Sequence, residues 1–260
     1  MKPAFLPLVI RLLLVALSLI CVVGAPAANL AAQDKAVIDE MTVKSKELQR
    51  RIIATGDPLE KARLQKSLVQ LMEDTLPRLS ENGRLPLLVG IRVMQPFQQA
   101  SAAYTEMTTA FFDSAEGDFT TIKQRTEIAV RLAAIDRLQA ANLGLIRMLE
   151  GAEAEATRVI KEQNVPSEVA QDFLAGFRKG RSRTSGAAVA IRNLDTKVYA
   201  QLSAALNLLD ANWGKWSAGA EDGFTWQDPA LEREFTAIVS EIERLAELQA
   251  KAEAELARRA

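Results

Sequence analysis

The chain has no histidine and only one cysteine, Cys21, among its 260 residues. Histidine is the commonest general base near neutral pH and a frequent zinc ligand, so its absence removes many catalytic and metal sites. Cys21 lies inside an apolar N-terminal run, and without that run the chain has no thiol nucleophile, thiolate ligand or disulfide. We expect no metal, no cofactor and no catalytic residue of these kinds.

An excess of charge of either sign is also lacking. The first 27 residues contain Lys2 and Arg11 and no acid, which leaves the remainder with a net charge of −3. Such a balance gives no general attraction to nucleic acid, and we expect no nucleic-acid partner. Aromatic residues are scarce at 5%, but the 48% of hydrophobic residues is enough to form a core.

The N-terminal segment has the three-part layout of a secretory signal. Lys2 and Arg11 precede a compact apolar run over residues 12–23, and Ala25-Pro26-Ala27 fits the small-x-small rule for cleavage. We expect residues 1–27 to be a signal peptide and residues 28–260 to form one helical domain. The alternative is an uncleaved anchor, for which the run is shorter than the ~20 apolar residues of a membrane span.

Both interpretations place the body of the protein outside the cytoplasm. Cleavage predicts a periplasmic protein, whereas an anchor predicts the inner membrane with the body on the outer side. A lipoprotein signal is disfavoured because bulky Ile20 stands directly before Cys21, where such signals usually have a small residue.

From residue 34 onwards, apolar residues recur at steps of three and four, which is the spacing of one helix face. Gly56 and residues 164–167 are expected to separate helices, and Ser80-Glu81-Asn82-Gly83 is expected to form a turn. Period-2 strand patterns of useful length are missing, and residues 217–227 are expected to form a loop. The predicted fold class is all-α: an antiparallel bundle of five or six long helices, with coiled-coil-like spacing, after the signal segment.

Several boundaries can be predicted. Pro58 after Asp57 and Pro229 after Asp228 are typical of a capped helix start. Helices are expected over about 85–114, with a kink at Pro96, and over about 119–163. A later helix is expected to be interrupted near residues 180–186, and the tail at 250–260 to fray.

Each expected helix has one face of mainly apolar residues, and these faces are expected to form the core. The expected core stripes are Ile38, Met41, Ser45, Leu48, Ile52; Leu64, Leu68, Leu71, Thr75; Met94, Phe97, Ser101, Tyr104, Thr108, Phe111; Ile128, Leu132, Ile135, Gln139, Asn142, Ile146, Leu149; Leu194, Val198, Leu202, Ala205, Leu209, Asn212, Trp216; and Leu231, Phe235, Ile238, Ile242, Leu245, Gln249.

A basic stretch stands out from the rest of the chain. No acid occurs between Asp172 and Asp195, while five basic residues do. Arginine forks bind phosphate and carboxylate groups, so this stretch could hold an anionic partner such as a membrane surface. The alternative is a solvated helix corner whose charges pair with acidic neighbours. The candidate residues are Arg178, Lys179, Arg181, Arg183 and Arg192.

All three tryptophans gather near a turn-like sequence, Ala220-Glu221-Asp222-Gly223. One interpretation is an aromatic lid over a pocket or a belt at a membrane interface. The other is a plug that seals one end of the helical body. The candidate residues are Trp213, Trp216, Phe224 and Trp226.

Residues 85–94 are the most apolar stretch of the body, although Arg92 interrupts them. Ten residues are too few to cross a bilayer. The stretch therefore predicts a buried helix start, with insertion into a membrane as the alternative.

The C-terminal pattern resembles a family of helical envelope proteins from proteobacteria that is known only as a domain of unknown function. The resemblance rests on Trp213 and Trp216, then Asp222-Gly223-Phe224-Thr225-Trp226, then a helix containing Phe235. It covers about a quarter of the chain. Members often have a lipidated cysteine, from which Ile20 before Cys21 departs. The resemblance implies a location in the envelope and no activity.

Motifs of catalysis do not occur: there is no phosphate-binding loop, no Gly-x-Ser-x-Gly elbow and no Ser-x-x-Lys pair. The sequence favours an exported, non-catalytic helical protein that binds an envelope protein or a ligand. One alternative is a membrane-associated or membrane-active protein. Another is a hydrolase using only Asp/Glu or Ser/Lys, because carboxylates distant in sequence can meet in a fold.

We predict that residues 1–27 direct export. A fusion of this segment to a reporter that is active only outside the cytoplasm should give signal, and mass spectrometry of the mature protein should find an N-terminus near Ala28. A reporter that stays in the cytoplasm would contradict export. An intact N-terminus in the membrane fraction would contradict cleavage alone.

Overall fold

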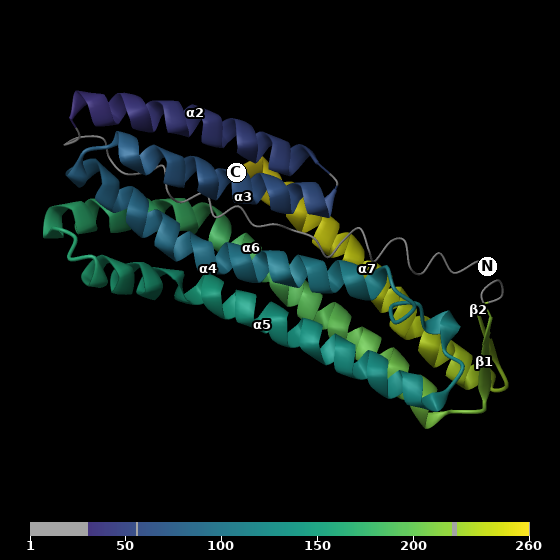
Figure 1. The fold of residues 1–260 in the computed structure, drawn as a ribbon. Coiled ribbons are helices and arrows are strands. Elements are labelled where there is room, and N and C mark those ends of the chain that lie inside the picture. Colours follow the sequence, from purple (N-terminus) through teal and green to yellow (C-terminus); the bar gives the residue numbers. More distant parts are fainter. Residues whose placement is uncertain (1–30, 56, 220–222, 260) are drawn as a thin grey trace. The chain divides into compact units, whose positions relative to one another are not determined.

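The computed structural model describes residues 31–55, 57–219 and 223–259, and the expected signal segment lies outside them. Over the described residues the fold is all-α except for one short hairpin, which confirms the predicted class (Figure 1). The helices are α2 (Ala32–Ala54), α3 (Pro58–Thr75), α4 (Glu81–Phe112), α5 (Arg125–Glu162), α6 (Ser167–Ala211) and α7 (Pro229–Arg259), with 3₁₀ turns η2 (Leu76–Arg78) and η3 (Phe119–Thr121).

The described chain divides into two compact units. Of the described residues, unit 1 contains 103–144, 190–219 and 223–254, and unit 2 contains 31–55, 57–102, 145–189 and 255–259. Helices α4, α5, α6 and α7 contribute residues to both units. Each unit therefore draws its core from segments that are far apart in the sequence.

The predicted helix starts at the two Asp-Pro pairs are confirmed. Pro58 and Pro229 are the first residues of α3 and α7. The Asp228 carboxylate accepts a hydrogen bond from the backbone N–H of Ala230 at 2.8 Å. Proline suits this position because a helix leaves its first N–H groups without intrahelical partners.

The expected turn at residues 80–83 is wrong, because α4 already begins at Glu81. Ser80 caps this helix: its hydroxyl accepts from the Gly83 N–H at 3.3 Å and donates to Asp34. The buried Asp34 carboxylate also accepts the Ser80 backbone N–H at 2.8 Å. A Cβ on Gly83 would lie 2.6 Å from Asp34 Oδ2, so only glycine permits this approach. Polar residues that suggested a turn are instead a helix cap.

Two further expectations about helix ends are corrected. Helix α6 continues through residues 180–186 without interruption, and α7 extends to Arg259. In α6, the buried side chains of Phe177, Thr184 and Ala188 anchor the segment and offset the weak helix propensity of its glycines. In α7, the Ala, Glu, Lys and Arg of the tail are strong helix formers.

The expected loop at residues 217–227 contains an antiparallel hairpin, so the expectation of no strand is also wrong. Strand β1 (Trp216–Gly219) pairs with β2 (Gly223–Trp226), and Trp216 is opposite Trp226. Side chains at alternate strand positions share a face, so the pairing brings Trp216, Phe224 and Trp226 to one side. Four-residue strands are too short to produce a recognisable period-2 pattern.

The core of unit 2 is a cluster of aliphatic and methionine side chains from α2, α3 and α4. Helices α2 and α3 pack side by side (Figure 1), and residues 85–94 supply Leu87, Ile91 and Met94 to the cluster. This confirms that the most apolar stretch is buried inside the fold. Over the described residues, no helix is both long and apolar enough to cross a bilayer.

Candidate functional site

A network of buried polar side chains lies inside unit 1. Arg192 Nη1 donates to Asp195 Oδ2 at 2.9 Å, and both side chains are at most 3% exposed. The Tyr104 hydroxyl donates to the same carboxylate oxygen at 3.2 Å and lies 2.6 Å from the Tyr199 hydroxyl. The Arg192 guanidinium also lies over the Tyr104 ring, 5.1 Å from its centroid. An ion pair and two phenols are therefore enclosed together.

Four helices contribute to this network. Tyr104 comes from α4, Asp195 from α6, and Gln249 of α7 forms a side-chain hydrogen bond with Asp195. On α5, the Asn142 amide donates to the Arg192 carbonyl at 2.8 Å and to the Thr196 hydroxyl at 3.0 Å. Each helix is thus held in one register by a polar contact in an otherwise apolar core.

Burial dominates the electrostatics of the network. It raises the pKa of Asp195 to about 6, against the opposing effects of the Arg192 guanidinium and hydrogen bonds from Tyr104 and Gln249. Burial likewise raises the pKa of Tyr104 and of Tyr199, and the Asp195 carboxylate adds to both shifts. Perturbed groups can mark an active site, but the ion pair, both phenols, Asn142 and Gln249 are each no more than about 2% exposed. A substrate cannot reach them, so we assign the network to the architecture of unit 1.

The basic stretch does not form one surface. Arg192 is buried in unit 1, whereas the others belong to unit 2. Arg178 pairs with Glu153 at 2.7 Å, and Arg181 donates to the Leu149 carbonyl and lies over the Phe177 ring. Lys179 is exposed. The side chain of Arg183 lies outside what the structure describes. Arg178 and Arg181 therefore hold α6 against α5 within unit 2.

The structure brings the aromatic residues together in unit 1. Trp216 is buried, and its indole N–H donates to the Leu209 carbonyl at 2.8 Å. Its ring contacts Trp213 and Phe224 edge to face, with centroids 5.2 and 5.6 Å apart. Trp226 and Phe224 in turn pack on Phe235 of α7. Trp213 is 38% exposed, so the cluster has a buried anchor and a solvated edge.

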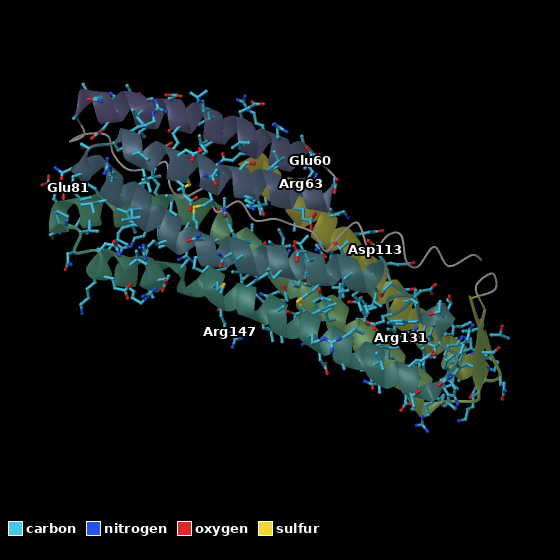
Figure 2. The ribbon with its side chains drawn as sticks, viewed as in Figure 1. Glu60, Arg63, Glu81, Asp113, Arg131 and Arg147 are labelled. Atoms are coloured by element: carbon cyan, nitrogen blue, oxygen red, sulfur yellow. The ribbon has the colours of Figure 1, made fainter. Side chains whose placement is uncertain are left out.

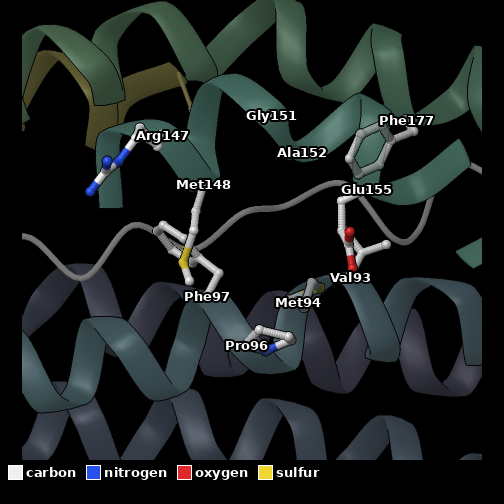
Figure 3. A pocket seen from close by; sticks show the side chains of 10 residues that line it. All are labelled: Val93, Met94, Pro96, Phe97, Arg147, Met148, Gly151, Ala152, Glu155 and Phe177. Atoms are coloured by element: carbon white, nitrogen blue, oxygen red, sulfur yellow. The ribbon is translucent and has the colours of Figure 1, made fainter. Parts of the chain in front are cut away.

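The candidate binding site is a pocket in unit 2 between α4, α5 and α6, with a volume of about 410 Å³. Its walls are mainly apolar: Met94 and Phe97 of α4 face Met148 and Ala152 of α5, and Phe177 of α6 closes one end (Figure 3). The full lining is Val93, Met94, Pro96, Phe97, Arg147, Met148, Gly151, Ala152, Glu155 and Phe177. A concave apolar surface of this size with few polar groups is typical of small-ligand sites.

Small or exposed residues on α5 keep the pocket open. A Cβ on Gly151 would meet no atom within 4 Å, and the Met148 side chain is 42% exposed. Across the pocket, Pro96 continues α4 but has no N–H, so the Arg92 carbonyl lacks its usual helical donor. The missing side chain and the proline ring leave space where two helices would otherwise pack closely.

Two charged residues occupy opposite ends of the pocket. Arg147 lies at one end and Glu155 at the other, beside Val93 and Phe177 (Figure 3). Glu155 accepts hydrogen bonds from Arg158 Nε at 2.8 Å and Arg158 Nη2 at 2.5 Å, which lowers the pKa of its carboxyl. The Arg147 side chain projects away from the ribbon of α5 (Figure 2), and no acidic group pairs with it within the described residues.

Other chemistry has less support. In the part of the chain that the structure describes, no three Asp, Glu, His or Cys side chains gather as metal ligands do. Comparisons of the chain with family models, with curated proteins and with solved structures gave no match.

The sequence indicated part of these arrangements. Tyr104, Asn142 and Gln249 are polar residues within expected apolar stripes, and all three are buried. The expected stripes do not include Asp195 or Tyr199. The spacing of Asp195, four residues after Ile191 and three before Val198, nevertheless places it on the buried face. The pocket had no sequence signal, because it is formed by a glycine, a proline and helix spacing.

We predict that Trp216→Ala lowers the unfolding free energy by about 3–5 kcal/mol, since it removes a buried ring and its hydrogen bond. Trp213→Ala is the matched control, with an expected loss of about 1 kcal/mol or less at its more exposed position. Urea unfolding followed by circular dichroism measures both. Equal losses would contradict the assignment of Trp216 as the anchor.

We also predict that Arg192→Met destabilises unit 1 by about 3–5 kcal/mol at neutral pH, because the Asp195 carboxylate keeps its burial and loses its cation. The deficit should shrink as the pH falls, since protonation of Asp195 removes the lone charge. This should begin above pH 6, because the guanidinium that lowers the pKa of Asp195 is absent from the variant. Adding Asp195→Leu should recover about half of the loss or more. A single variant as stable as the parent chain would show that the pair has no such role.

Proposed function

We propose that this protein is an exported, non-catalytic helical protein of the cell envelope that binds a small apolar ligand in the pocket of unit 2. The observation that carries the proposal is the apolar lining of that pocket, in which Phe97 and Phe177 are buried while Met148 remains exposed. Methionine adapts to ligands of different shape, and a partly exposed one at a pocket gains apolar contact when a ligand enters.

Location in the envelope is supported by the N-terminal layout of basic residues, an apolar run and Ala25-Pro26-Ala27. An antiparallel bundle within unit 1 is supported by the buried network, which draws side chains from α4, α5, α6 and α7. A helical fold with a pocket between packed helices suits a binding protein, because the site is formed before the ligand arrives.

A ligand fits the geometry better than a protein partner does. The pocket is concave and bounded by three helices, whereas large exposed hydrophobic residues in unit 2 are few and separate, such as Val43 on α2 and Met148 on α5. Protein interfaces usually need a contiguous apolar patch, and single exposed apolar side chains are ordinary.

The test is binding of a neutral fluorescent probe, N-phenyl-1-naphthylamine, whose emission rises in apolar surroundings. We expect saturable binding to the full mature chain and a loss of about tenfold or more with Gly151→Phe, because the ring fills open space at the pocket wall. Folding should be retained or improved slightly, since phenylalanine has a higher helix propensity than glycine.

Gly186→Phe is the matched control. Gly186 is also a glycine in a helix of unit 2 with nothing within 4 Å of an added Cβ, and it does not line the pocket. This variant should bind the probe like the parent chain. Equal binding by all three proteins, or no saturable binding to the parent chain, would contradict the proposed site.

A further inference from the structure

We propose that the pocket selects a single-chain anionic amphiphile, such as a long-chain carboxylate, with its head group at Arg147 and its chain along the apolar walls. This inference rests on the proposed function and adds the chemical class of the ligand. The evidence is the position of the two charged residues of the lining and the ion pairs that each of them does or does not form.

Two charged residues line the pocket, Arg147 and Glu155. Arg158 binds Glu155 and also pairs with Glu162, so the Glu155 carboxylate is already engaged on the surface of α5. Arg147 has no such ion pair within the described residues. Of the two charged groups, the guanidinium is therefore the one left to bind a ligand, which favours a ligand with a negative charge.

The other arginines between α5 and α6 differ from Arg147 in having their donors engaged. Arg178 is bound to Glu153 at 2.7 Å and Arg181 to the Leu149 carbonyl. These guanidinium groups join α5 to α6 and have their donors engaged. Arg147 is exposed on α5 with its donors available, and a guanidinium binds a carboxylate through two parallel N–H groups.

The α5 residues of the lining form a continuous path along the helix. Arg147, Met148, Gly151, Ala152 and Glu155 lie on one face, and the eight steps from first to last cover about 12 Å of helix. Small Gly151 and Ala152 leave the middle of that path open. A head group at Arg147 remains in contact with water, while an unbranched chain extends over Met148 towards Phe177. This is the arrangement that an amphiphile requires, because its charge stays solvated while its chain is buried.

The experiment measures displacement of N-phenyl-1-naphthylamine from the mature chain by dodecanoate, kept below its micellar concentration, and by dodecanol. We expect dodecanoate to bind about five- to tenfold more tightly than dodecanol. A difference of this size is what one charge-assisted hydrogen bond between the carboxylate and solvent-exposed Arg147 contributes. Arg147→Gln should remove this preference and leave dodecanol unchanged. The preference should also decrease at high salt.

Arg137→Gln is the matched control, because Arg137 is an exposed arginine of the same helix that does not line the pocket. Its variant should keep the preference for dodecanoate. Equal binding of acid and alcohol, or equal effects of the two substitutions, would overturn the inference. The neutral probe would still bind in that case, so the proposed function itself would stand.

A second arm separates a free amphiphile from a lipid surface. Phosphatidylglycerol vesicles present an anionic head group in a bilayer, and phosphatidylcholine vesicles serve as the neutral reference. We expect dodecanoate to displace the probe in the absence of vesicles. Arg147-dependent flotation with phosphatidylglycerol, without displacement by monomeric dodecanoate, would overturn the proposal and assign Arg147 to membrane attachment.

Discussion

The Arg192–Asp195 ion pair is the constraint on which the packing of unit 1 depends. Two charges without water are costly, and their attraction offsets more of that cost when further hydrogen bonds reach the pair. Tyr104 and Gln249 bind the Asp195 carboxylate, and Asn142 binds the Arg192 carbonyl, so three other helices contact this segment of α6. A shift of any helix by one turn would break a buried polar contact. The network therefore favours one register among the many that apolar stripes alone would tolerate.

Unit 2 is organised by a different principle. The ion pairs among its described residues lie at the surface, as where Arg178 joins α6 to α5, and Asp34 holds the start of α4 through hydrogen bonds. Its interior includes a cluster rich in methionine, with Met41, Met72 and Met94. Methionine fills irregular space with little directional preference. Such a core specifies packing less strictly than a polar network does. The pocket between α4, α5 and α6 lies in this unit.

Most of the fold could be predicted because apolar residues recur at steps of three and four along the sequence of a long helix. All six side chains of the stripe from Met94 to Phe111 are buried, as the spacing of three and four indicated. The errors lie where short-range polar chemistry decides the outcome. Ser80 caps the start of α4 because Asp34, which is distant in the sequence, binds it. Trp216 pairs with Trp226 in strands too short to show an alternating hydrophobic pattern. Local patterns do not contain such long-range contacts.

The candidate site could be predicted far less well, since the relevant signal is the spatial context of ordinary residues. Arg147 and Gly151 resemble any other arginine and glycine of a helix until α4 and α6 are placed beside them. The basic stretch and the tryptophans were conspicuous in the sequence, yet Arg192 is buried in an ion pair and Trp216 anchors a hairpin. Unusual composition therefore indicated structural constraint as readily as binding.

The central claim is that the mature protein holds an anionic amphiphile in the pocket of unit 2. The most direct measurement is mass spectrometry of the organic extract from protein purified from the periplasm without detergent, with Gly151→Phe protein prepared in parallel. We expect a single-chain carboxylate or related anion to be enriched with the parent chain and depleted with the variant. An extract identical for the two proteins, or enriched only in neutral compounds, would contradict it.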